Sequence, residues 1–282
     1  LAEYHQEIAG KTWADFDSET EEYNQKVEKH NKDLAKYLKM HPDTSLSTAK
    51  NIVGHTPWPP PARPDLFTRP CGLYETMMSQ VKDYTFNGMV WYQGENDTDR
   101  AEQYYKLLPL LIQTWRRRLH DSSLPVKLIQ LPGYADYPED SAALIRQVQL
   151  QTAKAMPEVD LVSFVDGGEE YNIHPTNKKV MGERLGQIEV GNDYAGTPFV
   201  KKCQYSDGKL ALTIARCEYL KLEHKVAIEI TTEDGRKQIE LTDDNLVQNQ
   251  ILINLDKKPQ EISYAYANFS NDIGLYNELD YP

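Results

Sequence analysis

Two patterns of hydrophobic and polar positions follow one another along the chain. From about residue 73, short apolar runs at 88–92, 126–131 and 161–165 alternate with segments of helical period at 73–81, 101–119, 141–155 and 178–186. Strands that alternate with helices of this length form a parallel sheet with both faces covered. The pattern therefore predicts an α/β fold over residues 64–195, with a parallel sheet whose two faces are covered by helices.

The pattern changes after Gly196-Thr197-Pro198. Short alternating runs at 210–214, 226–230 and 251–253 are separated by the turn sequences Ser206-Asp207-Gly208 and Asp234-Gly235. Alternation with Gly-containing turns is typical of antiparallel strands. We expect an α/β domain at 1–195, with a helical and Pro-rich lead-in at 1–63, followed by a β module at 196–282 that packs on it.

The lead-in is strongly polar. Residues 17–40 carry sparse apolar positions among Glu, Lys, Asn and Gln, which predicts a solvated helix with a narrow apolar face. The following segment Thr56-Pro57-Trp58-Pro59-Pro60-Pro61 lacks most of its N–H donors, so it predicts a surface loop with an exposed Trp58.

Charge and cysteine usage exclude several classes of function. The net charge of −12 disfavours nucleic acid and anionic membranes as partners, and the longest apolar runs are too short to cross a bilayer. The three cysteines lack CxxC spacing, so we expect no metal site and no cofactor. Cys203 and Cys217 either pair with each other or remain two unpaired buried thiols.

The candidate chemistry lies where two apolar runs end. The first run continues into Gln93-Gly94-Glu95, and Ile173-His174-Pro175 follows the third run. Ligands of open α/β sheets bind at the carboxyl edge of the strands, so we expect Gln93 and His174 to approach one cleft. A histidine at such an edge is a candidate general base.

In order and context these motifs resemble the sialate O-acetylesterase family of the SGNH hydrolases. The resemblance rests on Trp91-Tyr92-Gln93-Gly94-Glu95, on the helix from Tyr105 to Trp115-Arg116, and on Ile173-His174-Pro175 with Gly182-Glu183-Arg184-Leu185. Arg69-Pro70 before Leu73-Tyr74, Arg146 with Gln149, and Tyr264-Ala265-Tyr266-Ala267-Asn268 also match. It covers roughly residues 64–282 and implies an SGNH- or flavodoxin-like three-layer α/β core, with a parallel sheet that is incomplete at its N-terminal side, plus a C-terminal antiparallel β module.

The resemblance implies a serine carboxylic ester hydrolase that removes O-acetyl groups from sialic acid or a related sugar. A serine attacks the acetyl carbonyl, a histidine takes its proton, and preorganised donors stabilise the oxyanion. By this resemblance His174 is the base and Gln93 is an oxyanion donor. Glu95 is then an acceptor for a sugar hydroxyl or an anchor, and Arg146 is a candidate partner for a substrate carboxylate or a supporting residue.

Two departures from the family pattern stand out. No Gly-x-Ser sequence occurs in the chain, so we expect the nucleophile to come from an upstream segment of the polypeptide or from a second chain, and the 282 residues alone to be inactive. Related enzymes also carry an Asp two or three residues before this histidine, where this chain has Asn172 and Tyr171. A backbone carbonyl, Asp166, Glu169 or Glu170 remains as the group that orients His174.

Alternative readings keep the fold and change the function. One is an esterase for another acetylated sugar, such as acetylated xylan, and the other is an inactive carbohydrate-binding relative, which the missing Ser and Asn172 favour. The resemblance implies a secreted, periplasmic or lysosomal protein, although no targeting sequence is recognisable in these 282 residues.

Overall fold

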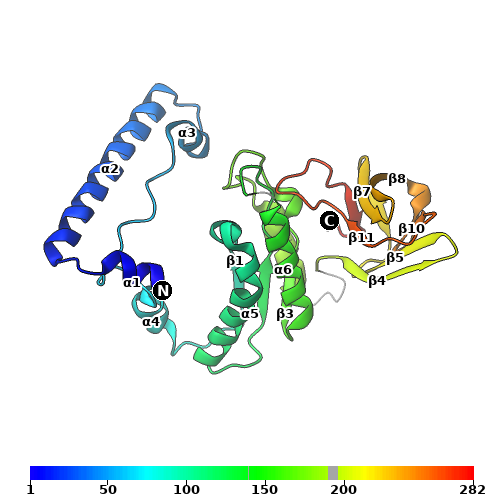
Figure 1. Cartoon of the computed structure of the whole chain (residues 1–282), viewed down its shortest axis with the longest axis horizontal. Helices are drawn as coiled ribbons and strands as arrows, with labels where there is room; N and C mark the ends of the chain where they lie inside the picture. Colours follow the sequence, from blue (N-terminus) through cyan, green and yellow to red (C-terminus); the bar gives the residue numbers. More distant parts are fainter. Residues whose placement is uncertain (139, 190–195) are drawn as a thin grey trace. The chain divides into compact units, whose positions relative to one another are not determined.

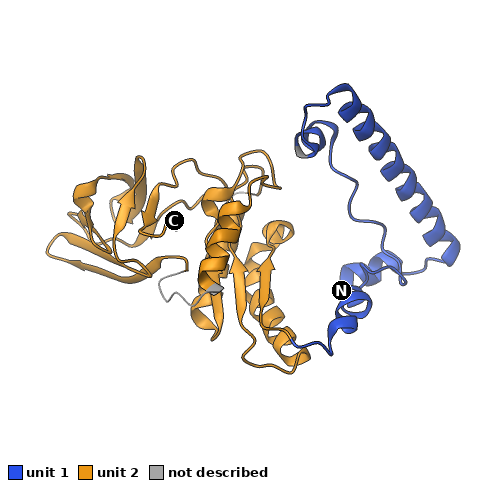
Figure 2. Cartoon of the chain, turned by 180° about the vertical axis from the view of Figure 1, so that it is seen from behind, with its two compact units in different colours: residues 1–85 blue, residues 86–282 orange. Residues whose placement is uncertain are grey.

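The computed structural model describes residues 1–138, 140–189 and 196–282, and the chain divides into two compact units, residues 1–85 and 86–282 (Figures 1 and 2). The predicted boundary at residue 195 lies outside the described residues. Each unit is considered by itself.

Unit 1 is helical. Its elements are α1 (Ala2–Ile8), α2 (Trp13–Met40), α3 (Leu46–Val53), the π-helical turn η1 (Tyr74–Met78) and α4 (Ser79–Val81). Thr12 and Asp15 form a reciprocal capping box that starts the long solvated helix α2. The proline-rich loop is held to α2 by a hydrogen bond from the Tyr23 hydroxyl to the Pro57 carbonyl, and Trp58 is 64% exposed, as predicted.

Unit 2 begins with the predicted α/β layer. Its elements are β1 (Met89–Tyr92), the 3-10 helix η2 (Glu95–Arg100), α5 (Ala101–Arg118), β2 (Val126–Ile129), α6 (Ser141–Ala155), β3 (Val159–Val162), the 3-10 turn η3 (Val165–Gly167) and α7 (Lys179–Glu189). The three strands pair in parallel in the order β1-β2-β3.

Helices cover both faces of this sheet. On one face Leu128 and Leu161 pack in a cluster with Leu108 of α5 and Ile145 of α6. The neighbouring residues Ile129 and Val162 point to the other face, where they pack with Ile188 of α7. Successive side chains of a strand point to opposite faces, so the apolar runs of β2 and β3 supply both layers. The predicted fold class is confirmed.

Strand β1 differs from its neighbours at its free edge. Within the described residues only β2 pairs with β1, and Val90 is 53% exposed. The far edge of β3, by contrast, receives two hydrogen bonds from Thr197, whose backbone N–H and hydroxyl both donate to the Leu161 carbonyl. β1 therefore has the uncharged apolar sequence of an interior strand but only one strand neighbour.

The remainder of unit 2 is the antiparallel β module. Its strands are β4 (Phe199–Ser206), β5 (Lys209–Ala215), β6 (Leu220–Leu222), β7 (Val226–Thr232), β8 (Gly235–Leu241), β9 (Leu246–Val247), β10 (Gln250–Asn254), β11 (Glu261–Ser263) and β12 (Leu275–Asn277), with the 3-10 turn η4 (Asp243–Asn245). They form sheets β4-β5-β10-β9, β11-β7-β8 and β12-β6 around one apolar core. Cys203 is exposed and Cys217 buried, and both are free thiols.

The β module lies beside the α/β layer within unit 2 (Figure 1), and polar contacts attach the two. Asn268 accepts from the Ala142 backbone N–H through its side chain and from the Tyr134 N–H through its carbonyl. Arg216 pairs with Asp160 of β3 at 2.5 Å. The module thus contacts the start of α6 and also β3, the strand at the opposite edge of the sheet from β1.

Candidate functional site

Gln93 directly follows β1 and is held at both ends of its side-chain amide. Its Nε2 donates to Asp97 Oδ2 at 2.6 Å, and its Oε1 accepts from the Tyr104 hydroxyl at 2.9 Å. The backbone carbonyl of Gln93 accepts from Gln149 Nε2 at 3.3 Å. An NH2 group carries two hydrogens, so the bond to Asp97 leaves a second N–H for another acceptor.

Gly94 allows the chain to turn closely past helix α6. A Cβ at Gly94 would lie 2.9 Å from Ile145 Cγ2, closer than such contacts occur. The glycine therefore permits a tight turn between β1 and η2, with Gln93 before it and Glu95, the first residue of η2, after it. Gln93 also lines a groove of about 320 Å³ beside Trp91 and α5.

Glu95 lies among phenol groups. Burial raises the pKa of Tyr104 to about 12, and the charges of Asp97 and Glu95 add to the effect. The pKa values of Tyr92 and Tyr137 are also raised, first by burial and then by the charge of Glu95. A half-buried carboxylate beside aromatic side chains is suited to polar groups carried on an apolar ring.

His174 is exposed and lies in a hydrogen-bonded loop after η3. Its backbone N–H donates to Asn172 Oδ1 at 3.1 Å, and Asn172 Nδ2 donates to Glu169 Oε2 at 2.8 Å. The other oxygen of Glu169 accepts from the backbone N–H and the hydroxyl of Thr176. These bonds, led by the Thr176 N–H, lower the pKa of Glu169.

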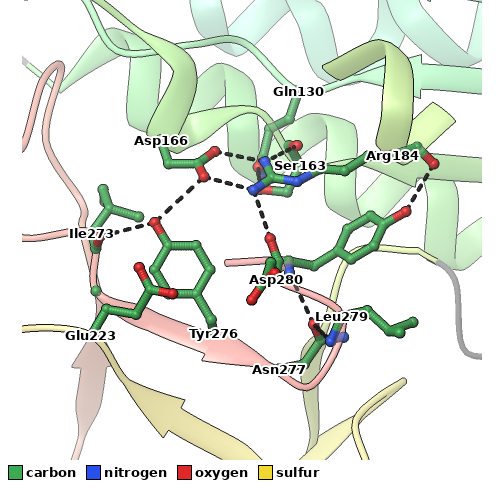
Figure 3. Close-up of polar contacts among 12 residues, drawn as sticks. Gln130, Ser163, Asp166, Arg184, Glu223, Ile273, Tyr276, Asn277, Leu279 and Asp280 are labelled. Atoms are coloured by element: carbon green, nitrogen blue, oxygen red, sulfur yellow. Dashed lines mark hydrogen bonds and ion pairs between the residues drawn. The ribbon is translucent and has the colours of Figure 1, made fainter. Parts of the chain in front are cut away.

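The other two acids considered for His174 have different partners. Asp166 accepts from both Arg184 nitrogens at 2.7 Å and from the Tyr276 hydroxyl at 3.4 Å (Figure 3). Glu170 accepts from the Tyr171 hydroxyl, which raises the Tyr171 pKa. Of the three, Glu169 is the acid with a hydrogen-bonded connection to the His174 backbone.

The Asp166–Arg184 pair ties the loop after β3 to the end of the β module. Arg184 also donates to the Ser163 and Asp280 carbonyls, and its own carbonyl accepts from the buried Tyr281 hydroxyl (Figure 3). Ser163 donates to Gln130 Oε1 at 3.0 Å, which joins the residues that follow β2 and β3. This network fixes the loop base from which His174 projects.

Contacts join the segments that carry Gln93 and His174. Lys178 Nζ, four positions after His174, lies 4.6 Å from the ring centroid of Tyr92, the last residue of β1. The Glu170 carbonyl accepts from the Ala135 N–H in the segment after β2. Gln93, Glu95 and the His174 loop thus follow the carboxyl ends of strands of one parallel sheet.

Arg146 occupies a different environment. It is 6% exposed, and its Nη2 donates to the carbonyls of Ala265 and Ala267 in the segment after β11. It lines a cavity of about 540 Å³ between α6 and the β module rather than the groove beside Gln93. Burial lowers its pKa to about 10, and Nη1 has no hydrogen-bond partner.

Sequence reasoning did not assign the residues that hold Gln93 and the His174 loop. Tyr104 is buried on the side of α5 that packs on the sheet, and its hydroxyl also reaches Gln93. Asp97 lies just before α5, whose N-cap is Arg100, and it binds Gln93. The spacing of four between Gln93 and Asp97 was the available signal.

The described part of the chain contains no cluster of three or more His, Cys, Asp or Glu side chains placed to hold a metal ion. Nor does it contain a helix that is both long and apolar enough to cross a bilayer.

A parallel sheet covered by helices on both faces and joined to an antiparallel module defines an α/β fold of the SGNH-like type. A solved carbohydrate acetylesterase from Xanthomonas citri has a similar fold, with a TM-score of 0.67 and 24% identity over 74% of this chain and 52% of that one. Residues 63–196 match the family described as carbohydrate esterase, sialic acid-specific acetylesterase. This segment of the chain is therefore similar to that carbohydrate esterase family.

Two curated relatives are sialate O-acetylesterases. The protein from Mus musculus is 33% identical over 75 residues, which cover 24% of this chain and 14% of that protein. The protein from Rattus norvegicus is 25% identical over 195 residues, which cover 58% of this chain and 33% of that protein. The chain therefore spans about a third or less of the relatives that it matches.

Proposed function

We propose that this chain forms the part of a serine esterase that supplies the base and an oxyanion donor for removing O-acetyl groups from sialic acid or a related sugar. The observation that carries the proposal is the fixed amide of Gln93, within a segment that matches sialic acid-specific acetylesterases. The names of the mouse and rat relatives support sialate as the substrate.

The chemistry follows from the positions of the groups. A serine hydroxyl attacks the acetyl carbonyl carbon while His174 accepts the hydroxyl proton, and His174 then returns the proton to the departing sugar oxygen. The second N–H of the Gln93 amide stabilises the oxyanion, and Asp97 and Tyr104 keep that amide from rotating. A water molecule then attacks the acetyl-serine carbonyl carbon while His174 accepts its proton. The serine oxygen departs with that proton, and acetate is released.

The serine is proposed to arrive on a further strand that pairs with the free edge of β1. The support is the sequence Met89-Val90-Trp91-Tyr92, which carries none of the charges or prolines that protect natural edge strands. Neighbouring strands lie about 4.8 Å apart. A parallel strand on β1 would thus end beside Gln93 and could present a serine there.

The decisive experiment compares a polypeptide extended upstream of residue 1 with the 282-residue chain on an aryl acetate and on O-acetylated sialic acid. The extended protein should hydrolyse both, and His174→Ala should abolish turnover while His5→Ala, in the exposed helix α1, leaves it unchanged. Full activity of His174→Ala would remove His174 as the base. An extended protein that binds O-acetylated sialic acid without cleaving it would favour the inactive relative.

A further inference from the structure

We propose that Glu169, acting through Asn172, is the positioning residue of His174. The inference rests on the proposed function, because it concerns the placement of the proposed base. A series of two hydrogen bonds connects these residues. Asn172 donates to the Glu169 carboxylate through its amide NH2 and accepts from the His174 backbone N–H through its amide oxygen.

The Asn172 side chain bridges Glu169 and His174. It is 8% exposed, so both halves of its amide need partners within the protein. Its NH2 donates to Glu169 Oε2 and its oxygen accepts from the His174 N–H. The negative carboxylate of Glu169 therefore selects the amide orientation that leaves the oxygen facing His174.

Glu169 also fixes the other side of the loop. Its Oε1 accepts from the Thr176 N–H at 2.6 Å and from the Thr176 hydroxyl at 2.7 Å. His174 thus lies in the chain between Asn172 and Thr176, which both bind the Glu169 carboxylate; we call this arrangement the clamp. The next residue, Glu170, is hydrogen-bonded through its carbonyl to the segment after β2, which holds the clamp in place.

The donor-to-acceptor directions of these hydrogen bonds predict which substitutions break the clamp and which restore it. In Glu169→Gln, an NH2 group replaces one acceptor and opposes a donor of Asn172 or Thr176, so one bond is lost in each amide orientation. In Asn172→Asp, two carboxylates oppose each other. In the double variant Glu169→Gln/Asn172→Asp, the Gln NH2 donates to the Asp, and the second Asp oxygen still accepts from His174.

The test is backbone amide exchange at His174 in the 282-residue chain labelled with ¹⁵N-histidine. The chain has seven histidines, so the spectrum holds few signals, and His174→Gln identifies the relevant one. Loss of a hydrogen bond to the carboxylate should speed exchange at His174 about tenfold in each single variant, and the double variant should return it to within about twofold. Glu170→Gln, the same charge change one residue away, is the matched control and should have no effect.

The inference is overturned if Glu169→Gln leaves exchange at His174 unchanged, or if the double variant exchanges as fast as the sum of the single effects. The remaining histidine signals report whether each variant is folded. If Glu169→Gln does not fold, the comparison of Asn172→Asp with the double variant still decides the outcome, because only a positional role predicts slower exchange in the double. The measurement needs no substrate, so it stands or fails separately from the esterase activity.

A second readout connects the clamp to catalysis. In the upstream-extended protein, Glu169→Gln should lower kcat at nearly unchanged KM, and the double variant should recover kcat. Equal kcat in Glu169→Gln and the unmodified protein would show that the clamp does not position the base.

Discussion

At the scale of single residues, the proposed catalytic side chains are held by hydrogen bonds from neighbours that have no proposed role in the reaction. Tyr104 is the clearest case. It is 3% exposed, donates to Gln93 Oε1 and accepts from Trp91 Nε1 at 3.3 Å. One phenol thus links the end of β1 to α5 and holds the proposed oxyanion donor.

Tyr104→Phe should therefore affect stability and catalysis separately. Removing the hydroxyl leaves Gln93 Oε1 without its partner, which should lower the free energy of unfolding by about 1–2 kcal/mol in urea titrations. In the extended protein the freed amide should cost about tenfold in kcat, less than the ~100-fold or greater loss from removing the donor in Gln93→Ala. Tyr105→Phe, on the exposed side of the same helix, is the control.

Arg146 is expected to act on stability rather than on substrate. Arg146→Ala leaves the carbonyls of Ala265 and Ala267 without their donor and opens space inside unit 2, so we expect a loss of about 2–4 kcal/mol. The kinetic constants for an uncharged acetyl ester should stay unchanged at a temperature where the variant is folded. A raised KM only for substrates with a carboxylate would instead support contact with the sugar acid.

At the scale of elements, the pH dependence of the His174 loop follows from Glu169. Its pKa is lowered in the folded protein by the Thr176 and Asn172 bonds. A lowered folded pKa gives stability that is present above the unfolded value of about 4.3 and is lost as the pH falls through the folded value. Amide exchange in residues 172–176 should consequently accelerate below about pH 4 relative to Glu169→Gln, in which the dependence disappears.

The free edge of β1 leads to a prediction about association. An uncharged apolar edge strand favours pairing with other chains, so the 282-residue chain should self-associate at high concentration, as measured by light scattering. Val90→Lys puts a charge on a half-exposed position and should suppress association without changing the unfolding free energy by more than about 0.5 kcal/mol. Association that persists unchanged in Val90→Lys would point to another surface.

Elements with a strong period were predictable, whereas the ends of some of them were not. Helix α6 ends at Ala155 as expected, and strands β5, β7 and β10 include the predicted runs. Strand β3 begins at Val159 instead of Leu161, because Val159 pairs with Val126 although a charged Asp160 follows it. The Asp160 charge is offset by Arg216, a distant residue that no local pattern reveals.

The residues of the candidate site were named from family motifs, but their hydrogen-bond connections could not be. Family motifs indicated Gln93 and His174, whereas the bonds from Asp97, Tyr104 and Glu169 depend on how helices and loops pack in three dimensions. The sequence left Asp166, Glu169 and Glu170 equivalent beside His174. Only the packing of Arg184 against Asp166 and of Tyr171 against Glu170 separates them.

At the scale of the whole molecule, the two compact units suggest two independent folding blocks. A fragment of residues 86–282 retains the parallel sheet, the β module and their shared contacts, so it should fold alone and give the same amide spectrum as this region in the full chain. The unfolding transition of unit 1 should be separable from it. Loss of the 86–282 spectrum on removing residues 1–85 would show that the units depend on each other.

The bonds of Arg184 and Tyr281 carry a consequence for the order of synthesis. The loop after β3 is fixed partly by Asp280 and by Tyr281, whose side chain is fully buried. A ribosome releases β3 and α7 well before these residues, so the loop after β3 gains these bonds only after the entire β module has emerged. The proposed base thus reaches its final position after nearly all of these 282 residues have been translated.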